Sequence, residues 1–168
     1  MEISFEISQT IEQPIDKVFR FLSDFSNTTL WNYYIERVTK ISEGEIVVGS
    51  IFEMKRPHDL NRYIITELDH PRKIIVELQP QAPKHQLIFT LTSLNKYTTV
   101  NYRWNLDLRK YKLFKYLPGI IQNLVLTIPR SIILKKTKPA VEQNFKKLKE
   151  LLENGETILQ NGRKVQLF

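Results

Sequence analysis

Between residues 34 and 109, six short segments with the two-residue alternation of β-strands follow one another, separated only by turn residues. The breaks between the segments, such as SEGE, RPHDLN and DHPR, are rich in residues that favour turns. Strands joined by such short turns pair with their neighbours, so this region predicts an antiparallel meander. The six expected strands are 34–42, 46–56, 61–69, 73–80, 85–95 and 98–109.

A further strand and two helices are expected before the meander. Residues 3–11 alternate apolar and polar side chains, as a half-buried strand does. Pro14 suits the first position of a helix, and the apolar residues that follow it recur with helical spacing. Ser26 is placed to cap a second, very short helix over residues 27–32.

The chain is expected to end with a long amphipathic helix at 139–153, which begins at Pro139 and stops before the Asn-Gly pair at 154–155. A sheet with one apolar face needs a cover, and this helix is the natural one. We therefore predict an α+β fold in which a curved seven-stranded antiparallel sheet wraps around a long C-terminal helix, with two short helices after the first strand. Residues 1–154 form the domain, and residues 155–168 are expected to be a peripheral tail, with a hairpin signal at Asn161-Gly162.

Signals for catalysis and for metal binding are sparse. The chain has no cysteine, which excludes disulfides and thiolate sites. Its three histidines, His58, His70 and His85, lack metal-ligand spacing and fall in expected turns or at strand ends, so we interpret them as surface residues. No nucleophile-elbow or phosphate-loop motif is present. We expect no metal and no cofactor.

Four stretches in a fixed order resemble the START-like (SRPBCC) superfamily, and in particular its polyketide cyclase/dehydrase branch. They are IEQPIDKVFRFLSDFSNTTLWN, VGSIFEM, ITELDHPRKIIVE and AVEQNFKKLKELLE, and the resemblance spans residues 1–154. It implies the helix-grip fold with a hydrophobic cavity between sheet and C-terminal helix, in which family members usually bind small apolar ligands. The segment 110–138 departs from the family's pattern, because it is longer and more basic than the family resemblance implies.

Large side chains on the expected inner face are the candidates for this cavity. Trp31 either lines the cavity mouth, closed by Tyr33 or Tyr34, or seals the core. Arg56 and Tyr102 are polar residues that strand parity directs inward, where a ligand or an internal partner could satisfy them. The candidate cavity residues are Trp31, Phe52, Met54, Arg56, Val76, Phe89, Leu91, Tyr102, Trp104, Leu124 and Phe145.

Two functions compete for this cavity. The first is binding of a hydrophobic small molecule or lipid, as a carrier at a membrane surface. The alternative is a cyclase, dehydratase or aromatase acting on a polyketide-like substrate, with Tyr102 and Arg56 polarising a carbonyl. An enzyme needs positioned acid and base groups, and no pair of carboxylates or histidines is visible in the pattern. We therefore favour binding without catalysis.

The basic character of the chain is concentrated late in the sequence. The formal net charge is +7, and residues 103–149 hold 12 Lys and Arg against Asp107 and Glu142. Within them, an apolar run, LPGIIQNLVLTIP, lies between two basic flanks, as in segments that bind membrane interfaces. We interpret residues 109–138 as a broken helix or gate-like loop that faces an anionic membrane. The basic candidates are Lys110, Lys112, Lys115, Arg130, Lys135 and Lys136.

Two alternatives to a membrane contact fit the same basic segment. The lysines could be solvated while the apolar run packs on the domain, and RKYKLFKY superficially suits single-stranded nucleic acid, which we consider the weaker interpretation. The N-terminus has no secretory signal, so a cytoplasmic location, peripheral to a membrane, is expected. No pattern in the chain specifies an oligomeric state.

Overall fold

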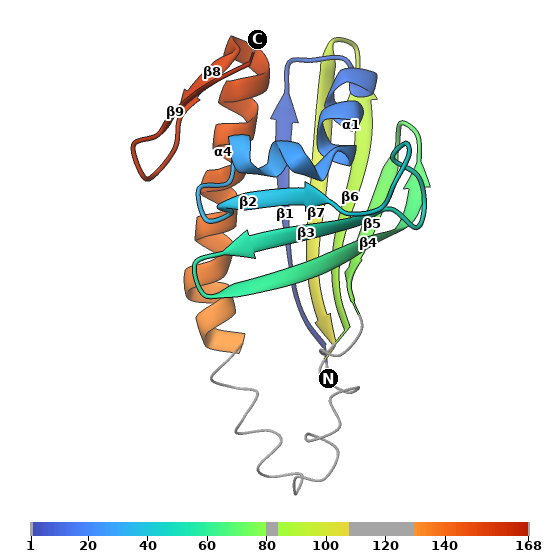
Figure 1. Ribbon diagram of the computed structural model, residues 1–168. Coiled ribbons are helices and arrows are strands. Elements are labelled where there is room, and N and C mark those ends of the chain that lie inside the picture. Colours follow the sequence, from blue (N-terminus) through green and yellow to red (C-terminus); the bar gives the residue numbers. More distant parts are fainter. Residues whose placement is uncertain (1, 80–83, 108–129, 168) are drawn as a thin grey trace, which may run out of the picture.

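The computed structural model describes residues 2–79, 84–107 and 130–167. It shows one curved antiparallel sheet of seven strands in the order β1-β7-β6-β5-β4-β3-β2, with a long helix, α4, lying along its inner face (Figure 1). The predicted helix-grip architecture is confirmed. The strands are β1 (Glu2–Ile11), β2 (Arg37–Lys40), β3 (Ile51–Arg56), β4 (Asp59–Asp69), β5 (Lys73–Leu78), β6 (Lys84–Leu94) and β7 (Tyr97–Asp107).

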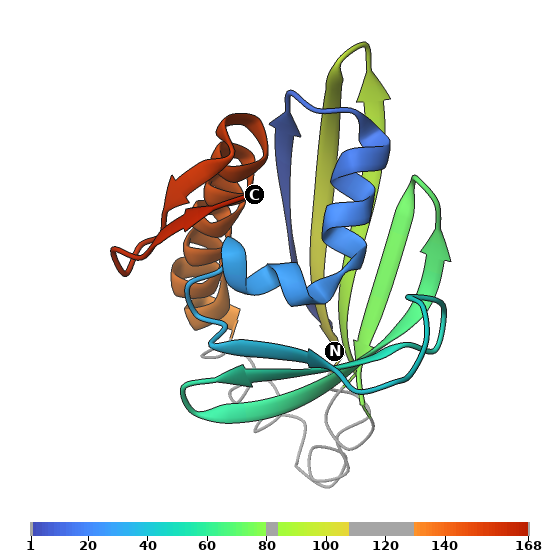
Figure 2. The same cartoon turned by 45° about the horizontal axis from the view of Figure 1, so that its top comes forward.

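Two short helices connect the two edges of the sheet. The α-helix α1 (Ile15–Ser23) and the 3-10 helix η1 (Phe25–Leu30) lead from β1 at one edge to β2 at the other. Figure 2 shows α1 over β6 and β7, and η1 leading from the end of α1 toward α4. The predicted Ser26 cap is wrong, because Asp24 caps η1 by accepting a 3.0 Å hydrogen bond from the Ser26 amide, and η1 begins two residues earlier than expected.

The expected strand 46–56 is too long at its start. Residues 46–50 turn instead, because Ser50 donates its amide to the Val47 carbonyl at 3.0 Å and its hydroxyl accepts from the Val47 amide. Gly49 adopts φ of +95°, which a β-branched residue would resist. Local turn chemistry therefore outweighs the strand preference of Val47 and Val48.

Helix α4 (Lys138–Asn154) ends as expected at Gly155, whose left-handed φ of +76° closes the last turn. Its start differs from the prediction, since residues 130–132 are helical and a π-helical stretch, Ile133–Thr137, leads directly into it. Residues 130–137 therefore fit the broken-helix alternative and not the gate-like loop. The remainder of that segment, including Lys110, Lys112, Lys115 and Leu124, lies outside the described residues.

The core lies between the inner face of the sheet and the helices. Alternate residues of β5, β6 and β7 point inward, and the α4 stripe of Phe145, Leu148 and Leu152 packs on them. In β4, whose face the sequence leaves unassigned, Tyr63 and Ile65 are buried, and a bulge between Ile65 and Glu67 shifts the register.

The C-terminal residues form a hairpin of β8 (Glu156–Ile158) and β9 (Lys164–Gln166). Leu159 and Val165 of this hairpin belong to the buried core cluster. The attachment is thus tighter than the peripheral one expected from the sequence. Leu167 also donates its amide to the Gly155 carbonyl at 2.7 Å, which joins the end of the hairpin to its start.

Candidate functional site

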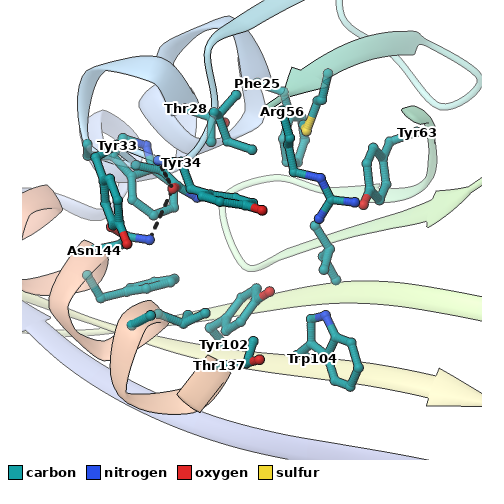
Figure 3. A pocket seen from close by; sticks show the side chains of 18 of the residues that line it. Phe25, Thr28, Tyr33, Tyr34, Arg56, Tyr63, Tyr102, Trp104, Thr137 and Asn144 are labelled. Atoms are coloured by element: carbon teal, nitrogen blue, oxygen red, sulfur yellow. Dashed lines mark hydrogen bonds between the residues drawn. The ribbon is translucent and has the colours of Figure 1, made fainter. Parts of the chain in front are cut away.

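A cavity of about 420 Å³ lies between the first half of α4 and the inner face of the sheet. Its size is within the range of small-molecule sites, roughly 300–1,000 Å³. Side chains from η1, the connection to β2, strands β3, β4, β6 and β7, and α4 surround it (Figure 3). The lining residues are Phe25, Thr28, Trp31, Asn32, Tyr33, Tyr34, Ile35, Met54, Arg56, Tyr63, His85, Leu87, Phe89, Tyr102, Trp104, Lys136, Thr137, Ala140, Val141, Asn144 and Phe145.

The connection after η1 forms one side of the cavity. Trp31 is buried and meets Phe145 edge-on, with ring centroids 5.2 Å apart. Tyr33 and Tyr34 line the cavity while remaining partly exposed to solvent. The aromatic residues of this connection thus serve both purposes weighed from the sequence, since Trp31 packs on the core and the tyrosines form the rim.

An aromatic surface covers the floor of the cavity. The rings of Phe89 and Tyr102 lie 5.0 Å apart, and those of Tyr102 and Phe145 lie 5.1 Å apart. These tilted contacts are favourable aromatic geometries. They join β6, β7 and α4 into one continuous apolar face. Such a face offers an apolar or planar molecule extensive contact area.

A polar cluster occupies the side opposite Asn144 (Figure 3). Arg56 donates from Nε and Nη2 to the two carboxylate oxygens of Asp59, both at 2.6 Å. The Tyr63 hydroxyl lies 3.4 Å from Nδ1 of His85. Nε2 of His85 is buried and has no hydrogen-bond partner among the described residues. This end of the cavity therefore offers hydrogen-bonding groups in an apolar surrounding.

Burial determines the protonation of this cluster. It lowers the pKa of His85 to about 4, with a further contribution from the Arg56 charge, so the ring is neutral at pH 7. Burial raises the pKa of Tyr63 to about 12, and burial also raises the pKa of Tyr102. Burial acts to lower the pKa of Arg56, but the hydrogen bond to Asp59 and neighbouring groups raise it overall. The phenols remain protonated and can donate hydrogen bonds.

On the side of the cavity opposite the polar cluster, three side-chain amides are linked by hydrogen bonds. Asn144 of α4 donates through Nδ2 to Oδ1 of Asn32, and its own Oδ1 accepts from Nε2 of Gln160, both at 3.1 Å. Oδ1 of Asn32 also accepts from the Tyr34 amide at 3.1 Å. The cavity rim, α4 and the C-terminal hairpin are thereby connected through side chains.

Seven of the candidate cavity residues line the cavity: Trp31, Met54, Arg56, Phe89, Tyr102, Trp104 and Phe145. Phe52, Val76 and Leu91 do not, because they lie where sheet and helices pack closely, and they are fully buried in the core. Strand alternation shows that a residue faces inward, but it does not show whether that residue packs in the core or lines the cavity. Leu124 lies outside the described residues.

Several lining residues were missed. His85, interpreted as a surface residue, lies on β6 with its ring 5.1 Å from that of Trp104. Its two-residue spacing from Leu87 and Phe89 was a usable signal. Tyr63 is likewise two residues from the apolar Ile65, a spacing that places both side chains on one face of a strand. Asn144 had no signal, because its partners come from Asn32 and Gln160, distant in sequence.

The basic candidates fall into two groups. Arg130, Lys135 and Lys136 are exposed on the helical segment before α4, and Lys136 also lines the cavity. Lys110, Lys112 and Lys115 lie outside the described residues. Within the described ranges, no group of three acidic or histidine side chains could hold a metal ion. No helix in those ranges is long and apolar enough to cross a membrane.

Comparison with known proteins establishes the fold. The chain resembles the Polyketide_cyc-like protein Cgl2372 from Corynebacterium glutamicum, with a TM-score of 0.62, 18% identity, and coverage of 92% of this chain and 96% of that one. It also resembles the di-domain ARO/CYC StfQ from the steffimycin biosynthetic pathway, with a TM-score of 0.65, 13% identity, and coverage of 92% of this chain but 52% of that one. The Aha1 dimer from Colwellia psychrerythraea gives a TM-score of 0.56 at 16% identity, with coverage of 91% and 96%.

These neighbours have the START-like (SRPBCC) helix-grip fold, so the fold implied by the sequence resemblance is confirmed. At such low identities the likeness concerns the fold alone. No protein-family model matches the chain. Protein INO4 of Saccharomyces cerevisiae (strain ATCC 204508 / S288c) is 27% identical over 108 residues, which cover 64% of this chain and 69% of that protein. This similarity is too low to define a family.

Proposed function

We propose that this helix-grip protein binds a hydrophobic small molecule or lipid in the cavity between its sheet and α4. The observation that carries the proposal is the aromatic floor of Phe89, Tyr102 and Phe145 within a cavity of about 420 Å³. A ligand on this floor would remove apolar surface from water, which contributes roughly 25 cal/mol per Å². The nearby phenols and amides would orient its polar atoms.

A cavity-blocking variant tests this proposal. Ala140 of α4 lines the cavity, so Ala140→Phe would fill it, whereas Gln143→Phe adds the same ring on the exposed side of the helix. The neutral fluorophore N-phenyl-1-naphthylamine serves as probe. We expect saturable binding by the unaltered protein and by Gln143→Phe, and loss of binding in Ala140→Phe. Native mass spectrometry with organic extraction identifies any ligand carried from the expression host.

Two results would contradict cavity binding. One is failure of the unaltered protein to bind the fluorophore. The other is equal binding by the folded Ala140→Phe variant, with circular dichroism confirming that its fold is intact. Either result leaves the fold assignment unchanged, because the fold rests on sheet topology and not on ligand binding.

The finer proposal is that the protein carries its ligand at an anionic membrane surface. Ile132 and Leu134 are exposed large apolar residues, and they share a helical segment with the exposed Lys135 and Lys136. Apolar residues flanked by cations are typical of segments that enter the headgroup region. Because Lys136 also lines the cavity, the same segment would place the cavity close to the membrane.

A second candidate function, cyclisation or dehydration of a polyketide-like substrate, has its own supporting observation. The hydroxyls of Tyr63 and Tyr102 both belong to cavity residues, and both phenols are protonated at neutral pH. Donors of this kind can polarise a carbonyl. Two structural neighbours carry the names Polyketide_cyc-like and ARO/CYC.

Tyrosine variants distinguish catalysis from binding alone. If the protein is an enzyme, Tyr102→Phe and Tyr63→Phe abolish turnover of a poly-β-keto thioester while leaving probe binding and Tm nearly unchanged. If the unaltered protein produces no cyclised product, or if activity falls only in step with stability, the enzyme hypothesis is rejected. The binding proposal survives that outcome, since its test does not involve turnover.

A further inference from the structure

Arg56, a charged side chain of the cavity lining, is paired with a neighbouring carboxylate. Arg56 and Asp59 are cross-strand partners that flank the two-residue turn Pro57-His58 between β3 and β4. Their bidentate contact, with both N–O distances at 2.6 Å, uses both carboxylate oxygens. The tight turn and the paired strands hold the two side chains in register. Arg56 is therefore presented to the cavity together with its counter-charge.

The other polar groups at this end carry no charge. Tyr63 is protonated, and His85 is neutral at pH 7. Among the described lining residues, Lys136 is the other charged side chain, and it is exposed to solvent on the helical segment before α4. The interior formed by the described residues thus offers hydrogen-bond donors and acceptors without net charge.

This arrangement has different consequences for neutral and anionic ligands. A neutral hydroxyl or carbonyl group can be buried at low cost if it meets a hydrogen-bond partner. A carboxylate loses far more hydration free energy and needs a free opposite charge in return. Here the guanidinium is engaged, and the Asp59 carboxylate would repel a second anion beside it.

We propose that the Arg56–Asp59 pair makes the cavity select uncharged ligands, namely hydrophobic molecules bearing a hydroxyl, phenol or carbonyl group, over carboxylates of the same shape. Asp59 is then a specificity-determining residue that acts through Arg56. The inference rests on the proposed binding function and deepens it by naming the chemical class of ligand. It depends on the charge of Asp59 and not merely on the presence of Arg56.

Matched bicyclic probes test this selectivity. At pH 7, 2-naphthol is neutral and 2-naphthoate is ionised, while naphthalene lacks a polar group. Each is titrated against bound N-phenyl-1-naphthylamine. For the unaltered protein we expect affinity to decrease from 2-naphthol to naphthalene to 2-naphthoate, with 2-naphthol bound about tenfold more tightly than 2-naphthoate, as expected for one charge-related interaction.

The informative variant is Asp59→Asn, which keeps the shape and one acceptor oxygen but removes the counter-charge. The Asp59 side chain is exposed, so folding should be preserved. We expect affinity for 2-naphthoate to rise about tenfold, while that for 2-naphthol changes less than about twofold. Adding Arg56→Gln to Asp59→Asn should return 2-naphthoate affinity to its original value, because the gain requires a free guanidinium.

A charge-matched control comes from the same hairpin. Glu53 pairs with Arg62 at 3.1 Å, and neither residue lines the cavity. Glu53→Gln makes the same change in net charge as Asp59→Asn, and it should leave the affinities for all probes unchanged. A rise in 2-naphthoate affinity in this control would show that overall charge, and not the Arg56–Asp59 pair, determines selectivity.

The outcomes separate this inference from the proposed function. Equal affinities of the unaltered protein for 2-naphthol and 2-naphthoate, or no gain in Asp59→Asn, would overturn the inference while cavity binding stands. If neither N-phenyl-1-naphthylamine nor the three probes bind, both are overturned, because the cavity then takes no apolar ligand.

Discussion

Asn144 on α4 and Asn32 in the connection before β2 are joined by a 3.1 Å hydrogen bond between their side-chain amides, across 112 residues of sequence. Asn144 is 4% exposed and also accepts from Gln160 in the C-terminal hairpin. A buried amide with partners on both sides fixes the relative positions of three segments. One of these segments carries the tyrosines of the cavity rim.

Removing this amide should destabilise the protein. In Asn144→Ala, Oδ1 of Asn32 loses one donor and Nε2 of Gln160 loses its acceptor. We expect the free energy of unfolding to fall by about 1–3 kcal/mol, because two hydrogen bonds are lost and each contributes about 0.5–1.5 kcal/mol. Urea denaturation measures the change. Gln143→Ala, its exposed neighbour, is the control, and equal effects in the two variants would contradict a special role for Asn144.

The C-terminal hairpin should contribute to stability through one buried side chain. Leu159 is 2% exposed, whereas its neighbour Ile158 is 57% exposed. Leu159→Ala should therefore cost about 2–5 kcal/mol of unfolding free energy, and Ile158→Ala should change it by less than about 0.5 kcal/mol. Thermal and urea unfolding of both variants check this. A small effect of Leu159→Ala would mean that the hairpin is peripheral after all.

Stability should decrease as the pH falls from about 6.5 to about 4. Burial lowers the folded-state pKa of His85 from 6.5 to about 4. In this window the unfolded chain takes up a proton at His85 that the folded protein does not, so unfolding is favoured. Arg56 faces the ring from β3, while Tyr63 and Trp104 pack against it from β4 and β7. The loss due to His85 should be on the order of 2 kcal/mol.

Histidine variants isolate this effect from other titrating groups. Urea unfolding at pH 7 and pH 4.5 is compared for the unaltered protein, His85→Gln, and His58→Gln, which changes the two-residue turn before β4. The pH dependence should become shallower in His85→Gln than in His58→Gln, which removes an exposed histidine. An unchanged slope in His85→Gln would show that the folded and unfolded chains take up the proton at His85 over the same pH range.

Membrane attachment should depend on both the apolar and the basic side chains of the helical segment before α4. Ile132 and Leu134 are 50% and 39% exposed, and Lys135 and Lys136 are exposed beside them. We expect binding to vesicles containing phosphatidylglycerol, lost in high salt. Lys135→Glu with Lys136→Glu should weaken it more than tenfold, because each cation contributes about 1 kcal/mol.

An apolar double variant provides the second arm of this experiment. Ile132→Ser with Leu134→Ser should also weaken vesicle binding. Val47→Ser with Val48→Ser is the matched control, since those valines are 53% and 57% exposed in the turn before β3. Equal binding to anionic and neutral vesicles, or equal losses in the two serine variants, would contradict the proposed membrane contact.

Much of the architecture could be predicted because it follows from the local spacing of apolar, polar and turn residues in the sequence. Alternation in the strands, turn residues between them and helical spacing after Pro139 each depend on neighbours a few residues apart. Errors arose where a local hydrogen bond to a side chain determined the start of a helix or strand. Examples are Asp24 in place of Ser26 as the cap of η1, and Ser50 in the turn that shortens β3.

Within the candidate site, the sequence alone determined which residues face inward, including Tyr102, Trp104 and Phe145. Which inward residues line the cavity was decided by tertiary structure, because curvature of the sheet and the position of α4 leave Phe52 in the core and Tyr102 at a surface a ligand can reach. The link from Asn144 to Asn32 likewise depends on packing between segments distant in the chain. Periodicity acts over a few residues, whereas cavities and buried polar partners form only when distant elements meet.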